Sequence, residues 1–175
     1  QGTTRDQLNM NLDLNFSFIF NRLSIIDLSD LANQPMLSNH FGNLIMFNGE
    51  VFNHDSLRKS LELKNITFTT DHSDTEVVLN GLSDQGLSFL DKIVGQFSIF
   101  FLDSRNHKAY LIRDRLGQKP LFYYKDNETF AFSSNLKSLN KLIQKDAISE
   151  KAIFEYLNLG VVTSPNTIFE NYFKV

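Results

Sequence analysis

The chain has 175 residues, a formal net charge of −3 at pH 7 and 42% hydrophobic residues. This length and composition fit one domain that can bury an apolar core. The Lys and Arg residues are scattered, so nucleic acid and anionic membranes are poor candidate partners and a small polar substrate fits better. No apolar run approaches the roughly 20 residues that span a bilayer, and the first residues lack the apolar core of a signal peptide. We therefore expect a cytosolic protein.

Cysteine is absent from the 175 residues. Its absence excludes a disulfide framework, a thiolate metal site and a cysteine nucleophile within these residues. The four histidines share no metal-ligand spacing, so we expect no metal site; they are His40, His54, His72 and His107. The chain does not begin with Met and ends at Val175 without a turn signal, and we expect both ends to be truncated.

Short apolar runs, many with a period of two, dominate the chain and predict β-strands. In chain order the candidates are residues 16–26, 44–47, 66–69, 96–102, 109–112, 121–124 and 129–133. Polar stretches of turn formers at residues 103–108 and 125–128 predict hairpin connections. We therefore expect consecutive strands to pair antiparallel.

Apolar residues at helical spacing predict four short amphipathic helices. These residues are Leu57 and Leu61; Val78 and Leu82; Leu136, Leu139 and Leu142; and Ala152, Ile153, Tyr156 and Leu157. Ser73 and Glu76 have the spacing of a capping box, in which a hydroxyl and a carboxylate bind free amides, so a helix should begin near Ser73. Strands and two groups of helices predict an α+β fold of antiparallel sheets covered by helices.

Five residues at three places in the chain are candidates for a binding site. Asn48, Gly49 and Glu50 follow the apolar strand 44–47 and, taken alone, indicate a tight turn in which Gly49 has a positive φ. Arg22 alone could pair with a carboxylate at a sheet edge, and Asp74 could be a helix-start carboxylate favoured by the dipole. Together they have the chemistry that a zwitterionic amino acid and its amide require, because arginine holds carboxylates, carboxylates hold ammonium groups and amide N–H groups stabilise oxyanions.

Six sequence blocks resemble, in the same order, the class II (N-terminal-nucleophile) glutamine amidotransferase domain of the asparagine synthase family. They are residues 22–29 (RLSIIDLS), 33–36 (NQPM), 47–53 (FNGEVFN), 73–79 (SDTEVVL), 95–103 (GQFSIFFLD) and 113–124 (RDRLGQKPLFYY). Single blocks of this kind occur by chance, whereas the ordered set does not.

The resemblance implies a four-layer αββα sandwich of two antiparallel sheets, of the Ntn-hydrolase type. It also implies a role for each matching position. Arg22 is expected to hold the α-carboxylate of glutamine, in a pocket lined by the backbone of Leu23, Ser24, Ile25 and Ile26. Asp74 and Glu50 are expected to meet the α-amino group. The side-chain amide of Asn48 and the backbone N–H of Gly49 are expected to form the oxyanion hole.

The resemblance further implies that residues 1–160 are the glutaminase domain without its nucleophile segment and that residues 161–175 begin a linker. In the family, an N-terminal cysteine attacks glutamine with its own α-amine as base. The released ammonia passes to a C-terminal synthetase domain, which uses ATP and Mg²⁺ to amidate a carboxylate, here most readily aspartate. Glutamine and that domain are the expected partners, no cofactor is expected in the glutaminase domain itself, and a homodimer stays open.

The opening cysteine of the family and its Arg-Gly-Pro-Asp block have no counterpart in the 175 residues. Two explanations stay open: a truncated chain whose parent has the cysteine, or a paralogue without it that serves as a glutamine-binding or scaffold module. A further alternative keeps the glutaminase but changes the acceptor, since related proteins amidate carboxylates in sugar or secondary-metabolite pathways. Asn135, where the family has glutamate, is expected to affect contact with the synthetase domain.

Overall fold

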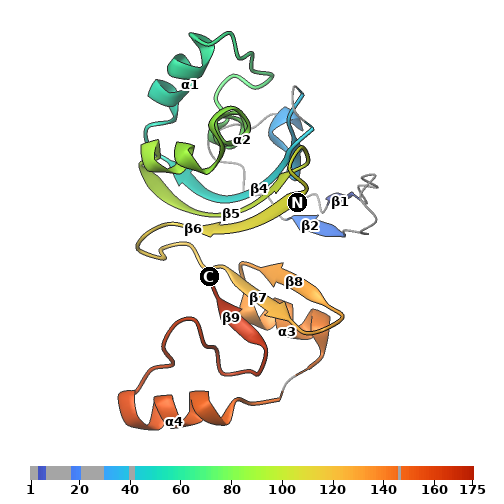
Figure 1. The fold of residues 1–175 in the computed structure, drawn as a ribbon, viewed down its shortest axis with the longest axis vertical. Helices are drawn as coiled ribbons and strands as arrows, with labels where there is room; N and C mark the ends of the chain where they lie inside the picture. The colour runs from blue at the N-terminus through green and yellow to red at the C-terminus, as the bar shows by residue number, and fades with distance from the viewer. Residues whose placement is uncertain (1–3, 7–16, 21–29, 40–41, 146) are drawn as a thin grey trace. The chain divides into compact units, whose positions relative to one another are not determined.

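The computed structural model of the chain describes residues 4–6, 17–20, 30–39, 42–145 and 147–175 (Figure 1). These residues form two compact units, residues 1–110 and residues 111–175. Each unit contains a β-sheet and two α-helices. The predicted α+β class is therefore confirmed.

A four-stranded sheet in the order β3-β4-β5-β6 forms the centre of the first unit, whose boundary after residue 110 falls within β6. Its strands are β3 (Met36–Leu37), β4 (Leu44–Val51), β5 (Gly95–Asp103) and β6 (Lys108–Arg113). β4 and β5 pair antiparallel over the whole length of β4, from Leu44 opposite Leu102 to Val51 opposite Gly95. A separate two-stranded sheet joins β1 (Thr4–Asp6) to β2 (Phe18–Phe20). The predicted strands 44–47, 96–102 and 109–112 are thus confirmed.

The helices of the first unit are α1 (His54–Glu62), α2 (Asp74–Gln85) and the short 3₁₀ helices η1 (Asp30–Ala32) and η2 (Gly86–Lys92). The sheet curves around α2, which packs against β4 (Figure 1). Gly81 lets the ring of Phe89 lie directly on the α2 backbone, because a Cβ at residue 81 would come within 2.2 Å of that ring. Phe89 is fully buried there. α2 is therefore held as part of the core rather than on the surface.

The predicted start of α2 is confirmed, since the hydroxyl of Ser73 accepts a hydrogen bond from the Glu76 N–H at 3.4 Å. The Glu76 carboxylate binds the preceding loop: it accepts from the N–H groups of Thr69 and Thr70 at 2.7 and 2.8 Å and from the Thr70 hydroxyl at 2.5 Å. The predicted strand 66–69 is wrong. Its last amide binds this carboxylate, and no neighbouring strand pairs with residues 66–69 in the described part of the sheet.

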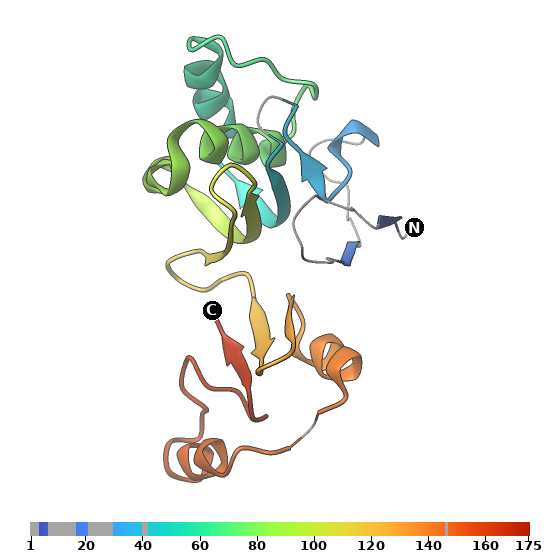
Figure 2. The same cartoon turned by 45° about the vertical axis from the view of Figure 1, so that its right-hand side comes forward.

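The second unit contains a three-stranded antiparallel sheet in the order β8-β7-β9 and two helices (Figure 2). Its elements are β7 (Phe122–Lys125), β8 (Phe130–Ser133), α3 (Leu136–Ile143), α4 (Glu150–Leu159) and β9 (Tyr172–Lys174). Leu139 of α3 is buried with Tyr124 and Tyr172, whose ring centroids lie 4.8 Å apart. Asn135 caps α3 by accepting from the Ser138 N–H at 3.0 Å. Because β9 pairs with β7, part of the stretch 161–175 is folded in this unit. The domain boundary at residue 160 stays a prediction.

Candidate functional site

Asn48 and Gly49 lie inside β4, opposite Ser98 and Phe97 of β5. The tight turn indicated by the Asn-Gly pair alone is therefore wrong, and Gly49 does not have a positive φ. Glycine is required there for another reason. A Cβ at residue 49 would lie 2.1 Å from the carbonyl oxygen of Gln96 and 2.7 Å from the Cα of Phe97. The two strands approach each other too closely at this point for any side chain.

Beyond the short strand β3, two side chains occupy the edge of β4 where a neighbouring strand would lie. The amide of Gln34 accepts from the Phe47 N–H at 2.6 Å and donates to the Phe47 carbonyl at 3.0 Å. Further along, the carboxylate of Asp74 accepts from the Val51 N–H at 3.1 Å. Backbone N–H groups point to alternate sides along a strand. The N–H of Gly49 therefore points to this same edge, between the two positions that the side chains occupy.

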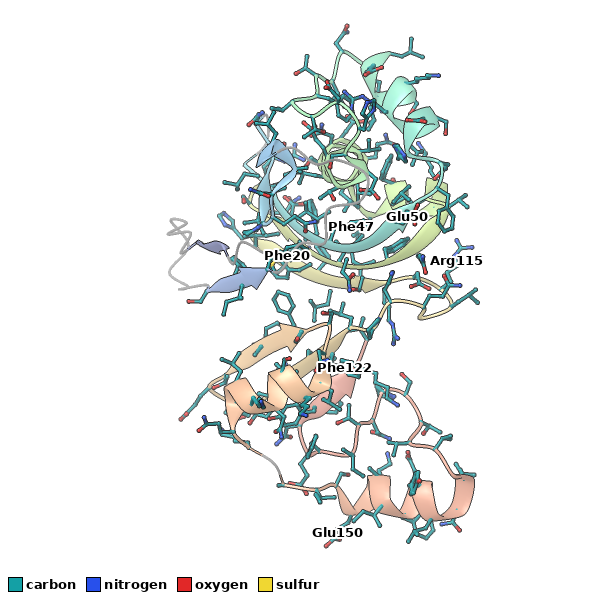
Figure 3. All side chains as sticks on the ribbon, turned by 180° about the vertical axis from the view of Figure 1, so that it is seen from behind. Phe20, Phe47, Glu50, Arg115, Phe122 and Glu150 are labelled. Atoms are coloured by element: carbon teal, nitrogen blue, oxygen red, sulfur yellow. The ribbon has the colours of Figure 1, made fainter. Side chains whose placement is uncertain are left out.

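The side chains of Asn48 and Glu50 are accessible to a ligand. Alternation along the strand sets them on one face of β4, opposite to Phe47 and Val51. Asn48 is half-buried and Glu50 is exposed, whereas Phe47 and Val51 are buried. Phe47 lies on the part of β4 next to α2, and Glu50 lies nearer the end of the strand (Figure 3). An amide, a backbone N–H and a carboxylate thus lie within three consecutive residues.

Asp74 brings a buried charge to this end of β4. It is the first residue of α2 and the residue is 6% exposed. Burial raises the pKa of its carboxyl and the charge of Glu50 raises it further, while the N–H groups of Val51 and Thr75 and the nearby His54 lower it, with a net increase. A bound cation such as an ammonium group stabilises the ionised form of a carboxylate whose charge is incompletely compensated in this way.

The structure brings together four of the predicted site residues, Asn48, Gly49 and Glu50 on β4 and Asp74 at the start of α2. Arg22 and the pocket residues Leu23, Ser24, Ile25 and Ile26 lie outside the described residues, and their roles stay predictions. The sequence did not predict a role for Gln34. Its neighbour Pro35 was the available signal, because proline has no N–H and ends regular strand pairing.

Among the described residues, no three His, Cys, Asp or Glu side chains are grouped so that they could hold a metal ion. None of the helices in this part of the chain is both long and apolar enough to cross a membrane.

Known sequences match this chain over most of its length. The family model described as glutamine amidotransferase domain matches residues 4–175. Glutamine-hydrolyzing asparagine synthetase 2 of Bacillus subtilis is 40% identical over 134 residues, which cover 77% of this chain and 17% of that protein. Glutamine-hydrolyzing asparagine synthetase 1 of the same organism is 36% identical, with 93% and 26% covered. A putative asparagine synthetase of Methanocaldococcus jannaschii is 32% identical, with 88% and 32% covered. The chain thus spans less than a third of the length of these relatives.

A solved structure supports the fold. The glutamine phosphoribosylpyrophosphate amidotransferase of B. subtilis, complexed with ADP and GMP, superposes with a TM-score of 0.53 at 22% identity, covering 63% of this chain and 26% of that one. At this identity the likeness shows the fold alone, which is of the predicted Ntn-hydrolase type. The match of the family model to nearly every residue shows more: the chain belongs to the glutamine amidotransferase domain family.

Proposed function

We propose that this chain binds glutamine as the glutaminase domain of a longer, glutamine-hydrolysing asparagine synthetase. The observation that carries the proposal is the arrangement at one end of β4, where Asn48, Gly49 and Glu50 adjoin the buried carboxylate of Asp74. Family membership and the printed names of the relatives support glutamine as the ligand.

The α-amino acid end of glutamine is held by opposite charges. Asp74 and Glu50 take the α-ammonium group, and the guanidinium of Arg22 takes the α-carboxylate with two parallel hydrogen bonds. Burial makes the charge of Asp74 costly in the absence of ligand, since it raises the pKa of the carboxyl. Binding of the ammonium group offsets part of that cost. The site therefore favours a ligand with an α-ammonium group over an uncharged ligand.

The side-chain amide of glutamine is the reacting group. When a nucleophile attacks its carbonyl carbon, negative charge develops on the carbonyl oxygen. The side-chain NH₂ of Asn48 and the backbone N–H of Gly49 are the donors for this oxyanion. The β4–β5 pairing makes this N–H rigid, because Gly49 is pressed against the backbone of Gln96 and Phe97.

The nucleophile in this proposal is a cysteine thiol from a part of the protein outside these residues, since the 175 residues contain no cysteine. Its attack forms a thioester and releases ammonia, and water then releases glutamate. A synthetase domain, beyond a glutaminase domain that ends near residue 160, uses ATP and Mg²⁺ to amidate aspartate with the ammonia. Dependence on ATP agrees with a cytoplasmic location.

A second candidate is a glutamine-binding or scaffold module without hydrolysis, in a natural protein that has no N-terminal cysteine. The N-terminal sequence of the natural protein separates the two, because the glutaminase requires an N-terminal cysteine. An enzyme that amidates a carboxylate other than aspartate keeps every feature of this site. Product analysis with a panel of carboxylate acceptors distinguishes it.

Titration calorimetry of the chain with L-glutamine tests the proposal directly. We expect saturable binding of L-glutamine, weaker binding of D-glutamine, and loss of binding in Arg22→Ala. Lys151→Ala removes the same charge from α4 of the second unit and should bind like wild type. Absence of glutamine binding by the folded wild-type chain would contradict the proposed function, and unchanged binding by Arg22→Ala would contradict the role of Arg22.

A further inference from the structure

The side chain of Gln34 stands in for a strand neighbour of Phe47. In the β3–β4 ladder Met36 lies opposite Ile45 and Leu37 lies opposite Leu44, so continuing the ladder brings residue 34 opposite residue 47. Regular pairing stops at Pro35, which has no N–H. The amide of Gln34 instead makes both bonds of a paired residue, accepting from the Phe47 N–H and donating to the Phe47 carbonyl.

The same amide reaches the start of α2. Its Nε2 donates to the hydroxyl of Thr75 at 3.5 Å, and Thr75 is the neighbour of Asp74. Gln34, Phe47 and Thr75 are all buried, with exposed fractions of 7%, 3% and 5%. One buried side chain therefore connects the residue before Asn48 to the residue after Asp74.

We propose that Gln34 is a positioning residue of the glutamine site, an inference that rests on the proposed function. It fixes the spacing between the oxyanion donors of Asn48 and Gly49 and the carboxylate of Asp74. These groups must contact opposite ends of one ligand, so a small shift between β4 and α2 spoils both contacts at once. Without the amide, the buried N–H and carbonyl of Phe47 lose their partner, and the edge of β4 is free to move.

Asn43, next to the start of β4, offers a matched control. It lies directly before β4, is 1% exposed, and also connects the sheet to α2 through its amide. It donates to the Ser83 hydroxyl at 3.1 Å and accepts from the Ser104 N–H at 2.9 Å. Because Asn43 adjoins the opposite end of β4 from Glu50, its loss costs stability without touching the site.

The test compares Gln34→Met with Asn43→Leu, each an apolar side chain of similar size. Both variants should unfold at lower temperature than wild type, because each leaves buried polar groups unpaired. At a temperature where all three proteins are folded, calorimetry should show glutamine affinity reduced roughly tenfold or more in Gln34→Met and by less than about twofold in Asn43→Leu. In a longer protein with the cysteine, kcat for glutamine hydrolysis should follow the same order.

A second readout does not depend on binding. The backbone amide resonances of Asn48 and Gly49 in ¹⁵N NMR spectra should shift in Gln34→Met and remain unchanged in Asn43→Leu. Equal affinity losses in the two variants, or unshifted resonances in Gln34→Met, would overturn the positioning role. Failure of wild type to bind glutamine would instead contradict the proposed function, and the resonances would still decide whether Gln34 fixes this end of β4. If Gln34→Met does not fold, the isosteric Gln34→Glu, which keeps an acceptor for the Phe47 N–H, replaces it in both measurements.

Discussion

The carboxylate of Asp74 accepts a hydrogen bond from the backbone N–H of Val51 at 3.1 Å, so the residue expected to bind an ammonium group also binds the edge of β4. The two roles have opposite energetic consequences. The hydrogen bond stabilises the fold, whereas burial of the charge raises the pKa of the carboxyl and destabilises the ionised form. The charge at this position is therefore kept at a cost in stability, which is typical of a ligand-binding group.

Asp74→Asn should separate these two roles. The asparagine oxygen can still accept from the Val51 N–H, and the buried charge is gone, so we expect a thermal midpoint at neutral pH equal to or above that of wild type. Glutamine affinity should fall about tenfold or more, because the ammonium loses a charged partner. Calorimetry and thermal unfolding measure the two effects. Asp84→Asn, which removes an outer carboxylate of α2 paired with Lys64, should leave affinity unchanged. A clear loss of stability in Asp74→Asn would show that its charge is not costly.

Glutamine affinity should depend on pH through Asp74. The free-state pKa of this carboxyl is raised above 3.8 by burial, and a bound ammonium lowers it, so binding weakens as the pH falls through the free-state value. The stability of the fold depends on pH in the opposite direction. Because the pKa of Asp74 is raised in the folded state, this carboxyl contributes stability below its unfolded pKa, and that stability is lost as the pH rises through the folded pKa. The affinity of wild type for glutamine should therefore fall as the pH is lowered through the acid range. The affinity should show a smaller pH dependence in Asp74→Asn, and equal dependence in the two proteins would assign the titration to another group.

Gly49→Ala should affect both stability and binding. The new Cβ would lie 2.1 Å from the Gln96 carbonyl oxygen, so the backbones of β4 and β5 must separate, at a cost of about 1–3 kcal/mol in the free energy of unfolding. The shift also moves the N–H expected to bind the oxyanion. Gly42→Ala is the control: nothing lies within 4 Å of its Cβ, and its φ of +65° costs about 1 kcal/mol without moving β5. Urea unfolding measures the stability of both variants, and calorimetry measures their affinity for glutamine. Equal affinities of the two variants would contradict this account.

Glu76→Ala should destabilise the first unit strongly. Its carboxylate accepts hydrogen bonds from the backbone N–H groups of Thr69 and Thr70 and from the Thr70 hydroxyl. The alanine variant loses all three bonds, which costs at least about 2 kcal/mol in the free energy of unfolding. Glu62→Ala removes an exposed glutamate that pairs only with Arg58 in the described structure, and should cost about 0.5 kcal/mol or less. Chemical unfolding measures both variants. Equal costs would mean that the Glu76 bonds contribute no more than a surface ion pair.

Local patterns in the sequence predict much of the fold correctly. The apolar runs and polar turns predict β4, β5, β6, β7 and β8, because a short apolar run between turn formers is a property of each segment alone. The same holds for the four helices and for the hydroxyl of Ser73 at the start of α2. β9 was not predicted, because the three residues Tyr172–Lys174 are too few to show a period.

The contacts that build the site could not be predicted in this way. Residues 66–69 have the pattern of a strand, but the N–H of Thr69 donates to the carboxylate of Glu76 on α2 instead of to a neighbouring strand. Gln34 and Asp74 each bind the edge of β4 from another part of the chain. Such contacts depend on which elements meet in three dimensions. The identities of Asn48, Gly49, Glu50 and Asp74 as site residues came from resemblance to a family and not from their spacing.

Asp126 organises the second unit and provides a test of its stability. Its Oδ2 accepts from the Tyr124 hydroxyl at 2.6 Å and from the Lys145 ammonium at 2.5 Å, and its Oδ1 accepts from the N–H groups of Glu128 and Thr129. Lys145, followed by Tyr124 and the two amides, holds the pKa of this carboxyl well below 3.8. A lowered pKa contributes stability above the unfolded value, and this stability is lost as pH falls through the folded value.

Asp126→Asn should therefore lower the thermal midpoint of the second unit at neutral pH. The difference from wild type should shrink as the pH is lowered below about 4, because the carboxyl of the unfolded wild-type chain then takes up a proton while the carboxyl of the folded chain, with its lowered pKa, stays ionised. Glu128→Gln, an exposed carboxylate in the same turn, should show no such dependence. Thermal unfolding of the three proteins across the acid range is the measurement. A difference between wild type and Asp126→Asn that stays constant down to the lowest pH would mean that the hydrogen bonds of Asp126, and not its charge, hold the turn to Lys145.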